Sequence, residues 1–178
     1  MALMTRKVLL LVTVGQPATS LLRDLEEPLA THLGLSAVAS KTVLSRPTYA
    51  LNESRAQYHC NAIMRRLVTL LEPAHALVLG VTDVDLFVPD SAFVFGEADR
   101  GTRSGVVSEA RLRPGASPEL LRRRVQAEVL TQAGHLLGLS YCEDARCVMC
   151  QAQTPQDVDR KQLALCNPCR NELQKLQR

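Results

Sequence analysis

Five of the six cysteines of this 178-residue chain lie in the 28-residue stretch that ends at Cys169. Tetrahedral zinc is commonly held by four thiolates, offered as two short-range pairs. Cys166-Asn-Pro-Cys169 forms one pair, and its proline helps to turn the chain so that both sulfurs face one point. The other pair is either Cys147 with Cys150 or Cys142 with Cys147, since both spacings suit a zinc site. We therefore expect one closed, structural zinc site rather than free buried cysteines.

A second group of chemically interesting residues directly precedes the cysteines. The stretch Thr131-Gln-Ala-Gly-His135-Leu-Leu-Gly138-Leu-Ser-Tyr141 resembles the metzincin zinc-protease motif HExxHxxGxxH. In that motif two histidines on one helix face, and a third after the glycine, bind a catalytic zinc ion. The glutamate beside the first histidine acts as general base on zinc-bound water.

The resemblance becomes more specific when the cysteines are included. The archaemetzincin family carries HExxHxxGxxHC, then a cysteine after four residues, a methionine two further on, and a late CxxC. This chain matches those positions with Cys142, Cys147, Met149, Cys166 and Cys169. Four more stretches resemble the family, so that the likeness covers nearly the whole chain: Asn52–Tyr58, Gly80–Leu86, Phe93–Ala98 and Ser108–Leu112.

The resemblance implies a fold and a set of metal ligands. It implies a compact, metzincin-like α/β single domain, with a mixed twisted sheet, flanking helices and a C-terminal four-cysteine zinc subsite. It favours Cys142, Cys147, Cys166 and Cys169 as ligands of one structural zinc ion, with Cys150 as the alternative ligand. Met149 occupies the position that lies under the metal in a working metzincin, and we assign it to the core.

The catalytic positions of the family motif are degenerate in this chain. Thr131 stands in place of the first histidine, Gln132 in place of the glutamate and Tyr141 in place of the third histidine. Only His135 remains, whereas catalytic zinc sites use three protein ligands. Glutamine cannot accept a proton as a general base does. We therefore expect that the catalytic zinc and the general base are lost.

Three functional hypotheses follow from these residues. The first is an archaemetzincin-like metallopeptidase homologue that is catalytically inactive and binds peptide or protein in the remaining cleft. In metzincins an edge strand pairs with the substrate, and one of the runs 92–97 and 105–112 is a candidate for that role. The second is an active zinc peptidase with an unconventional site around His135. The third is a zinc-ribbon-like interaction module.

Apolar runs predict the strands that must position these residues. Strands are expected at 8–14, 37–44 and 76–81, the last apolar on both faces as in a parallel sheet covered by helices. The runs 92–97 and 105–112 predict a hairpin or a pair of edge strands. Caps and glycines predict the helices 21–33 (N-cap Ser20, end Gly34), 53–71 (N-cap Asn52), 118–137 (N-cap Ser117, end Gly138) and a last one ending near Leu176.

Length and composition limit the remaining possibilities. A chain of 178 residues suits one domain, which we divide into a sheet-rich part (1–116), the active-site-type helix (117–138) and the zinc-binding part (139–178). A net charge of +3 gives no strong field for nucleic acid. The apolar run 8–14 is far shorter than the roughly 20 residues of a membrane span. Clustered thiols without a targeting signal favour the cytoplasm.

Overall fold

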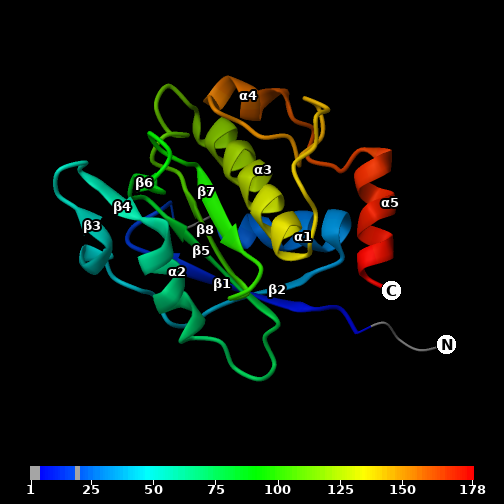
Figure 1. Cartoon of the computed structure of the whole chain (residues 1–178), viewed down its shortest axis with the longest axis horizontal. Helices are drawn as coiled ribbons and strands as arrows, with labels where there is room; N and C mark the ends of the chain where they lie inside the picture. Colours follow the sequence, from blue (N-terminus) through cyan, green and yellow to red (C-terminus); the bar gives the residue numbers. More distant parts are fainter. Residues whose placement is uncertain (1–4, 19–20) are drawn as a thin grey trace.

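A five-stranded sheet forms the centre of the computed structural model, which describes residues 5–18 and 21–178 (Figure 1). Its strands are β1 (Val8–Val14), β2 (Ser36–Ala39), β5 (Leu77–Thr82), β7 (Gly96–Asp99) and β8 (Ser104–Ser108). They lie in the order β2-β1-β5-β8-β7, the first four parallel and β7 antiparallel to β8. The predicted α/β class is confirmed. β7 and β8 form the predicted hairpin, but only Gly96 and Glu97 of the run 92–97 belong to β7, and β8 ends at Ser108 rather than at 112. β7 forms one edge of the sheet.

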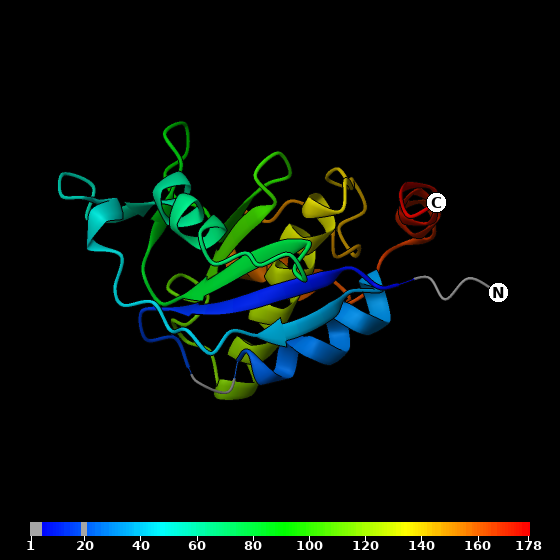
Figure 2. The ribbon, with the colours of Figure 1, turned by 90° about the horizontal axis from the view of Figure 1, so that it is seen from below.

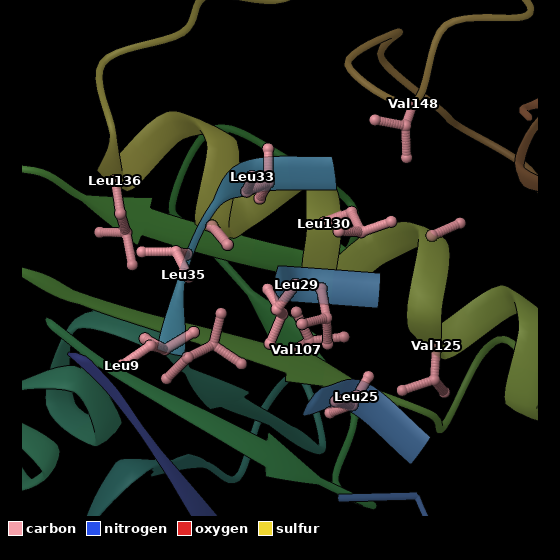
Figure 3. Close-up of a cluster of buried hydrophobic side chains, with 14 of the residues drawn as sticks. Leu9, Leu25, Leu29, Leu33, Leu35, Val107, Val125, Leu130, Leu136 and Val148 are labelled. Carbon is pink, nitrogen blue, oxygen red and sulfur yellow. The ribbon is translucent and has the colours of Figure 1, made fainter. Parts of the chain in front are cut away.

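Helices cover both faces of this sheet (Figure 2). α1 (Glu26–Leu33) and α3 (Pro118–Leu136) lie on one face, and α2 (Cys60–Val68) lies on the other. Successive strand side chains point to opposite faces, so Leu9 packs with α1 and α3 while Leu10 packs with α2. Figure 3 shows the first of these two cores, where side chains of α1 meet those of β8 and α3.

A second, small sheet replaces part of a predicted helix. It consists of β3 (Leu51–Asn52), β4 (Gln57–His59) and β6 (Leu86–Phe87). The predicted helix 53–71 is therefore wrong over its first third, and α2 begins only at Cys60, where the His59 side chain accepts a hydrogen bond from the Asn61 N–H.

The reason is local turn chemistry at Asn52. Its side chain accepts a hydrogen bond from the Arg55 N–H, as expected of an N-cap, but Ala56 then adopts a φ of +53°. A positive φ ends any helix at that point and turns the chain back into β4. Asparagine favours turns as well as helix caps, and the sequence pattern does not separate the two.

Two other predicted elements are shorter than expected. The strand expected at 37–44 is β2 alone, and Leu44 makes only an isolated bridge to Val14. The helix expected at 21–33 begins at Glu26, after a 3-10 turn over Arg23–Leu25. Its end at Gly34, with a φ of +67°, is confirmed. Ser20, its predicted N-cap, lies outside the described residues.

The C-terminal part packs against α3 and α1. α3 starts at the predicted cap, where Ser117 Oγ accepts from the Leu120 N–H, and Gly138 follows its end with a φ of +104°. Two short helices come after it, α4 (Pro155–Arg160) and α5 (Asn167–Leu176). Gln177 donates to the Leu33 carbonyl of α1. None of the helices in the described residues is long and apolar enough to cross a bilayer.

Replacing Asp159 of α4 with asparagine is expected to lower the free energy of unfolding by roughly 2 kcal/mol at pH 7. Asp159 accepts two 2.8 Å hydrogen bonds from the guanidinium of Arg124, a buried residue of α3. Without the carboxylate, that buried cation lacks a counter-ion. The expected loss stays below the about 3–5 kcal/mol of fully buried pairs because 32% of the Asp159 side chain is exposed.

The same ion pair predicts a pH dependence. The hydrogen bonds from Arg124 lower the pKa of Asp159, although partial burial opposes them. The pair therefore stabilises the fold above the unfolded-state pKa of about 3.9, and this contribution is lost as the pH falls through the lower folded-state value. The measurement is urea unfolding of Asp159→Asn and of the unaltered chain between pH 7 and about pH 2. The difference between their free energies of unfolding should disappear at the acidic end.

Glu172→Gln is the matched control. It removes an exposed ion pair with Lys175, and we expect it to lower the free energy of unfolding by less than about 0.5 kcal/mol. An equal loss in both variants would contradict the prediction.

Candidate functional site

Four cysteine sulfurs converge beside the end of α3. Cys142 follows that helix, Cys147 lies in the next turn, and Cys166 and Cys169 begin α5. The four Sγ atoms all lie within 4.8 Å of one another. Among residues 5–18 and 21–178, this is the one group of three or more Cys, His, Asp or Glu side chains whose ligand atoms are close enough to share a metal ion.

The geometry of this cluster fits zinc. Tetrahedral zinc with bonds of about 2.3 Å places two ligand sulfurs about 3.8 Å apart. The Sγ atoms of Cys142 and Cys166 are 3.7 Å apart, whereas a disulfide bond would bring them to about 2.0 Å. Burial opposes ionisation of Cys166, but hydrogen bonds from the Cys169 N–H and nearby thiols lower its pKa, whereas burial raises the pKa of Cys147 and of Cys169. A metal ion that binds here must therefore displace protons from the cluster.

Cys150 lies outside this group. Its backbone forms a bridge with that of Cys142, but its Sγ lies 3.6 Å from the Gln151 carbonyl oxygen. The structure thus brings together the four cysteines favoured by the family resemblance and leaves Cys150 apart. Which sulfurs bind an ion stays a prediction.

A cavity of about 610 Å³ opens between β7, the loop that precedes it and the C-terminal half of α3. Thr131, Gln132 and Tyr141 all line it, so the structure brings three of the four degenerate motif positions to one cleft. His135 lines a smaller adjoining cavity of about 390 Å³, which shares Gln132 and Tyr141 with the first.

Two charged residues form the floor of the larger cavity. Lys161, whose residue is 1% exposed, donates 3.1 Å hydrogen bonds to Glu128 and to the Thr131 hydroxyl. Burial raises the pKa of Glu128, and the ammonium group of Lys161 opposes that rise. Sequence reasoning missed this pair. The one available signal is Glu128 itself, a carboxylate three residues before Thr131 on the apolar face of the predicted helix.

Comparison with known proteins shows the family of this chain. Residues 32–175 match the model of peptidase family M54. An archaemetzincin of Methanocaldococcus jannaschii is 36% identical over 166 residues, which cover 90% of this chain and 89% of that protein. The chain belongs to the archaemetzincin family. The crystal structure of an archaemetzincin from Methanopyrus kandleri superposes with a TM-score of 0.84 at 33% identity, covering 96% of this chain and 95% of that one.

Archaemetzincin stretches that are distant in sequence meet in one hydrogen-bond network, which contacts a loop of the larger cavity. Asp85 accepts two 2.8 Å hydrogen bonds from the guanidinium of Arg111 and one of 3.2 Å from the Gln57 amide. Gln57 and Arg55 also donate to backbone carbonyls of the loop 88–95. This network fixes the loop, which forms part of the cavity wall.

Thr131, at the position of the first zinc ligand in the archaemetzincin motif, has its hydroxyl fully engaged. It donates either to the Ala127 carbonyl at 3.0 Å or to the Val148 carbonyl at 2.7 Å, and it accepts from the Lys161 ammonium. A metal ion at this hydroxyl would have to lie beside that positive charge. The residues present at this position therefore do not fit a catalytic zinc ion.

The imidazole of His135 is in a protonation state that suits metal binding, but His135 is the one histidine among the three ligand positions of the motif. Its Nδ1 lies 2.8 Å from the Leu139 carbonyl oxygen, so this nitrogen carries the proton. Nε2 is buried and has no hydrogen-bond partner among the described residues. Burial lowers the pKa of His135, which keeps the imidazole neutral.

Tyr141, at the third archaemetzincin ligand position, packs edge-on against the His135 ring with centroids 4.4 Å apart. Partial burial and the nearby carboxylates of Glu128 and Glu97 raise its pKa. The phenol is therefore held in its protonated form, which is a poor zinc ligand.

Met149 lies fully buried directly beneath α3, as the core assignment expects. A side chain at Gly134 would collide with the Met149 sulfur, which explains a glycine in the middle of this helix. Met149 therefore packs tightly against the middle of α3, one residue before the retained His135.

Proposed function

We propose that this archaemetzincin family member binds one structural zinc ion through Cys142, Cys147, Cys166 and Cys169, lacks peptidase activity, and binds peptide segments in its cleft. The engaged Thr131 hydroxyl is the observation that carries the loss of activity, because Lys161 supplies a positive charge where the family motif places a zinc ligand. When bound, the zinc ion would fasten residues 139–178 to the end of α3.

Peptide binding is supported by the shape and position of the cleft. A volume of about 610 Å³ lies within the range of small-ligand sites, and the cavity runs beside the edge strand β7. The network of Arg55, Gln57, Asp85 and Arg111 holds the loop 88–95, which lines the cavity, without using the degenerate motif positions. A defined cleft therefore persists although the catalytic ligands are gone.

A second candidate function rests on His135. Its unpaired Nε2 is the one motif nitrogen available to a metal, and an unconventional peptidase site would use it. A separate zinc-ribbon-like module is not favoured, because the turn 147–149 packs directly on α3 through the Thr131 and Val148 hydrogen bond. The cytoplasmic location inferred from the cysteines stays a prediction, and no membrane or nucleic-acid partner is proposed.

Metal counting combined with a peptidase assay tests the proposed function. We expect one zinc ion per purified chain by elemental analysis, and no cleavage of a pooled quenched-fluorescent peptide library above the buffer background. Two zinc ions per chain, with cleavage that His135→Ala abolishes, would instead support the second candidate. A chain purified without zinc that also fails to take it up would overturn the structural site.

A further inference from the structure

Cys142 and Cys150 are paired through their backbones, although one belongs to the four-sulfur group and the other does not. The two residues form an isolated parallel bridge, in which the Cys142 N–H donates a 3.0 Å hydrogen bond to the Met149 carbonyl. They are therefore register partners across the turn that carries Cys147. The fifth cysteine of the C-terminal part thus lies directly beside a candidate zinc ligand.

The bridge holds these two cysteines at a separation that a disulfide bond can span. Neighbouring strands lie about 4.8 Å apart, and a disulfide bond needs Cα atoms about 4.4–6.8 Å apart. Both thiols are free in the structure. The Cys142 sulfur lies 3.7 Å from that of Cys166, and the Cys150 sulfur lies 3.6 Å from the Gln151 carbonyl oxygen. Joining Cys142 to Cys150 therefore requires rotation of side chains rather than a movement of the backbone.

Cys150 is also the thiol that is most open to an oxidant when zinc is bound. Of the six cysteines, Cys60 and Cys147 are buried and the other four are partly exposed. Three of those four sulfurs belong to the four-sulfur group and would be bound to the metal, which leaves Cys150. A peroxide oxidises an accessible thiol to a sulfenic acid, which condenses with a neighbouring thiol to form a disulfide. Cys150 is suited to the first step, and Cys142 is the neighbour for the second.

We propose that Cys150 and Cys142 are a peroxide-sensitive thiol pair whose oxidation to a disulfide releases the zinc ion. This inference rests on the structural zinc ion of the proposed function and is independent of peptide binding. First, hydrogen peroxide oxidises the Cys150 thiol to a sulfenic acid, and one water molecule leaves. The Cys142 sulfur then leaves the zinc ion and attacks the Cys150 sulfur, while a proton from solvent converts the departing hydroxyl into a second water molecule.

This sequence of steps balances and has a direct effect on the metal. Each of the two sulfurs gives up one electron, and the peroxide takes up both as its oxygen–oxygen bond breaks. The zinc ion keeps three of its four thiolates, so that its closed tetrahedral site is lost. The disulfide is reversible, since a dithiol reductant can exchange with it and regenerate both thiols.

The test follows zinc release from the zinc-loaded chain in dilute hydrogen peroxide, by the absorbance of a chromogenic zinc indicator. We expect Cys150→Ala to release zinc roughly tenfold more slowly than the unaltered chain, because the thiols that remain in the C-terminal part are bound to the metal. A dithiol reductant added together with zinc after oxidation should restore the zinc content of the unaltered chain.

Disulfide mapping provides a readout that does not depend on zinc. Trypsin cleaves after Arg146, and so places Cys142 in the peptide 125–146 and Cys150 in the peptide 147–160. The oxidised chain, alkylated before digestion, should yield these two peptides joined by a disulfide bond. Fragmentation of the joined peptides in the mass spectrometer should assign the bond to Cys150 rather than to Cys147.

Cys60→Ala is the matched control, because it removes the other cysteine outside the four-sulfur group, one that is buried in the core. This variant should release zinc as fast as the unaltered chain, and thermal unfolding checks that its fold is retained.

The outcomes separate this inference from the proposed function. Equal rates of zinc release in Cys150→Ala and in the unaltered chain would overturn the inference and leave the structural zinc site in place. A disulfide between two members of the four-sulfur group, in place of the bond between Cys142 and Cys150, would do the same. A chain that contains no zinc before oxidation would overturn the proposed zinc site and the release step with it.

Discussion

Replacing Cys147 with alanine is expected to abolish zinc binding and to unfold the C-terminal part of the protein. Four-cysteine zinc sites contribute about 10–16 kcal/mol of apparent binding energy in zinc-finger peptides, which is as large as the whole stability of a typical domain. Cys147 is 2% exposed, and its sulfur also accepts a hydrogen bond from the Cys166 N–H. Zinc analysis and hydrogen exchange over residues 139–178 provide the measurement, and we expect protection there to fall at least about a hundredfold.

Cys150→Ala is the matched control for this prediction. Its sulfur lies outside the cluster, so the variant should retain one zinc ion per chain and native exchange rates. The reverse pattern, with zinc lost in Cys150→Ala and kept in Cys142→Ala, would replace the proposed ligand set by the two-CxxC arrangement. A zinc-edge anomalous map of crystals of the unaltered chain would show the same distinction directly.

Restoring the family motif is expected to create a second metal site with peptidase activity. The triple variant Thr131→His, Gln132→Glu and Tyr141→His supplies two ligands beside His135 together with a general base, on a helix whose glycine and methionine packing is intact. We expect two zinc ions per chain and cleavage of pooled quenched-fluorescent peptides. Elemental analysis and the initial cleavage rate are the measurements.

The double variant that keeps Gln132 separates metal binding from catalysis. It should also bind two zinc ions but cleave about 10²–10⁴ times more slowly, the usual contribution of a general base. If the triple variant still binds one ion, the prediction fails, and the charge of Lys161 is the first cause to test. Combining the triple variant with Lys161→Met and Glu128→Gln removes that charge without leaving a lone buried carboxylate.

The features that the sequence predicted well are those encoded locally. The apolar run at 76–81 predicts the buried central strand β5, because a strand covered by helices needs apolar residues on both faces. The short spacing of Cys166 and Cys169 brings two sulfurs together at the start of α5 whatever the rest of the chain does. The position of Thr131 and Gln132 at one cleft follows from the family motif.

The features that it did not predict depend on contacts between distant segments. In the sequence, Lys161 cannot be distinguished from an exposed charged residue after a short helix. It is buried against Glu128 because α4 packs on α3. The hairpin at β3 and β4 forms because Tyr58 pairs with Leu86, a partner 28 positions away. Local patterns at Asn52 are equally compatible with a helix, so the choice between them is made by the tertiary structure.

The Val148 carbonyl, which accepts the Thr131 hydroxyl, belongs to the same turn that carries Cys147. The turn 147–149 therefore carries one cysteine of the candidate metal site and also holds Thr131, which lines the cleft. Two such sites are thermodynamically linked: if loading the four cysteines raises the affinity of the cleft for a peptide, that peptide raises the affinity for zinc by the same factor. Under the proposed function, peptide binding in the cleft would in this way depend on the availability of zinc.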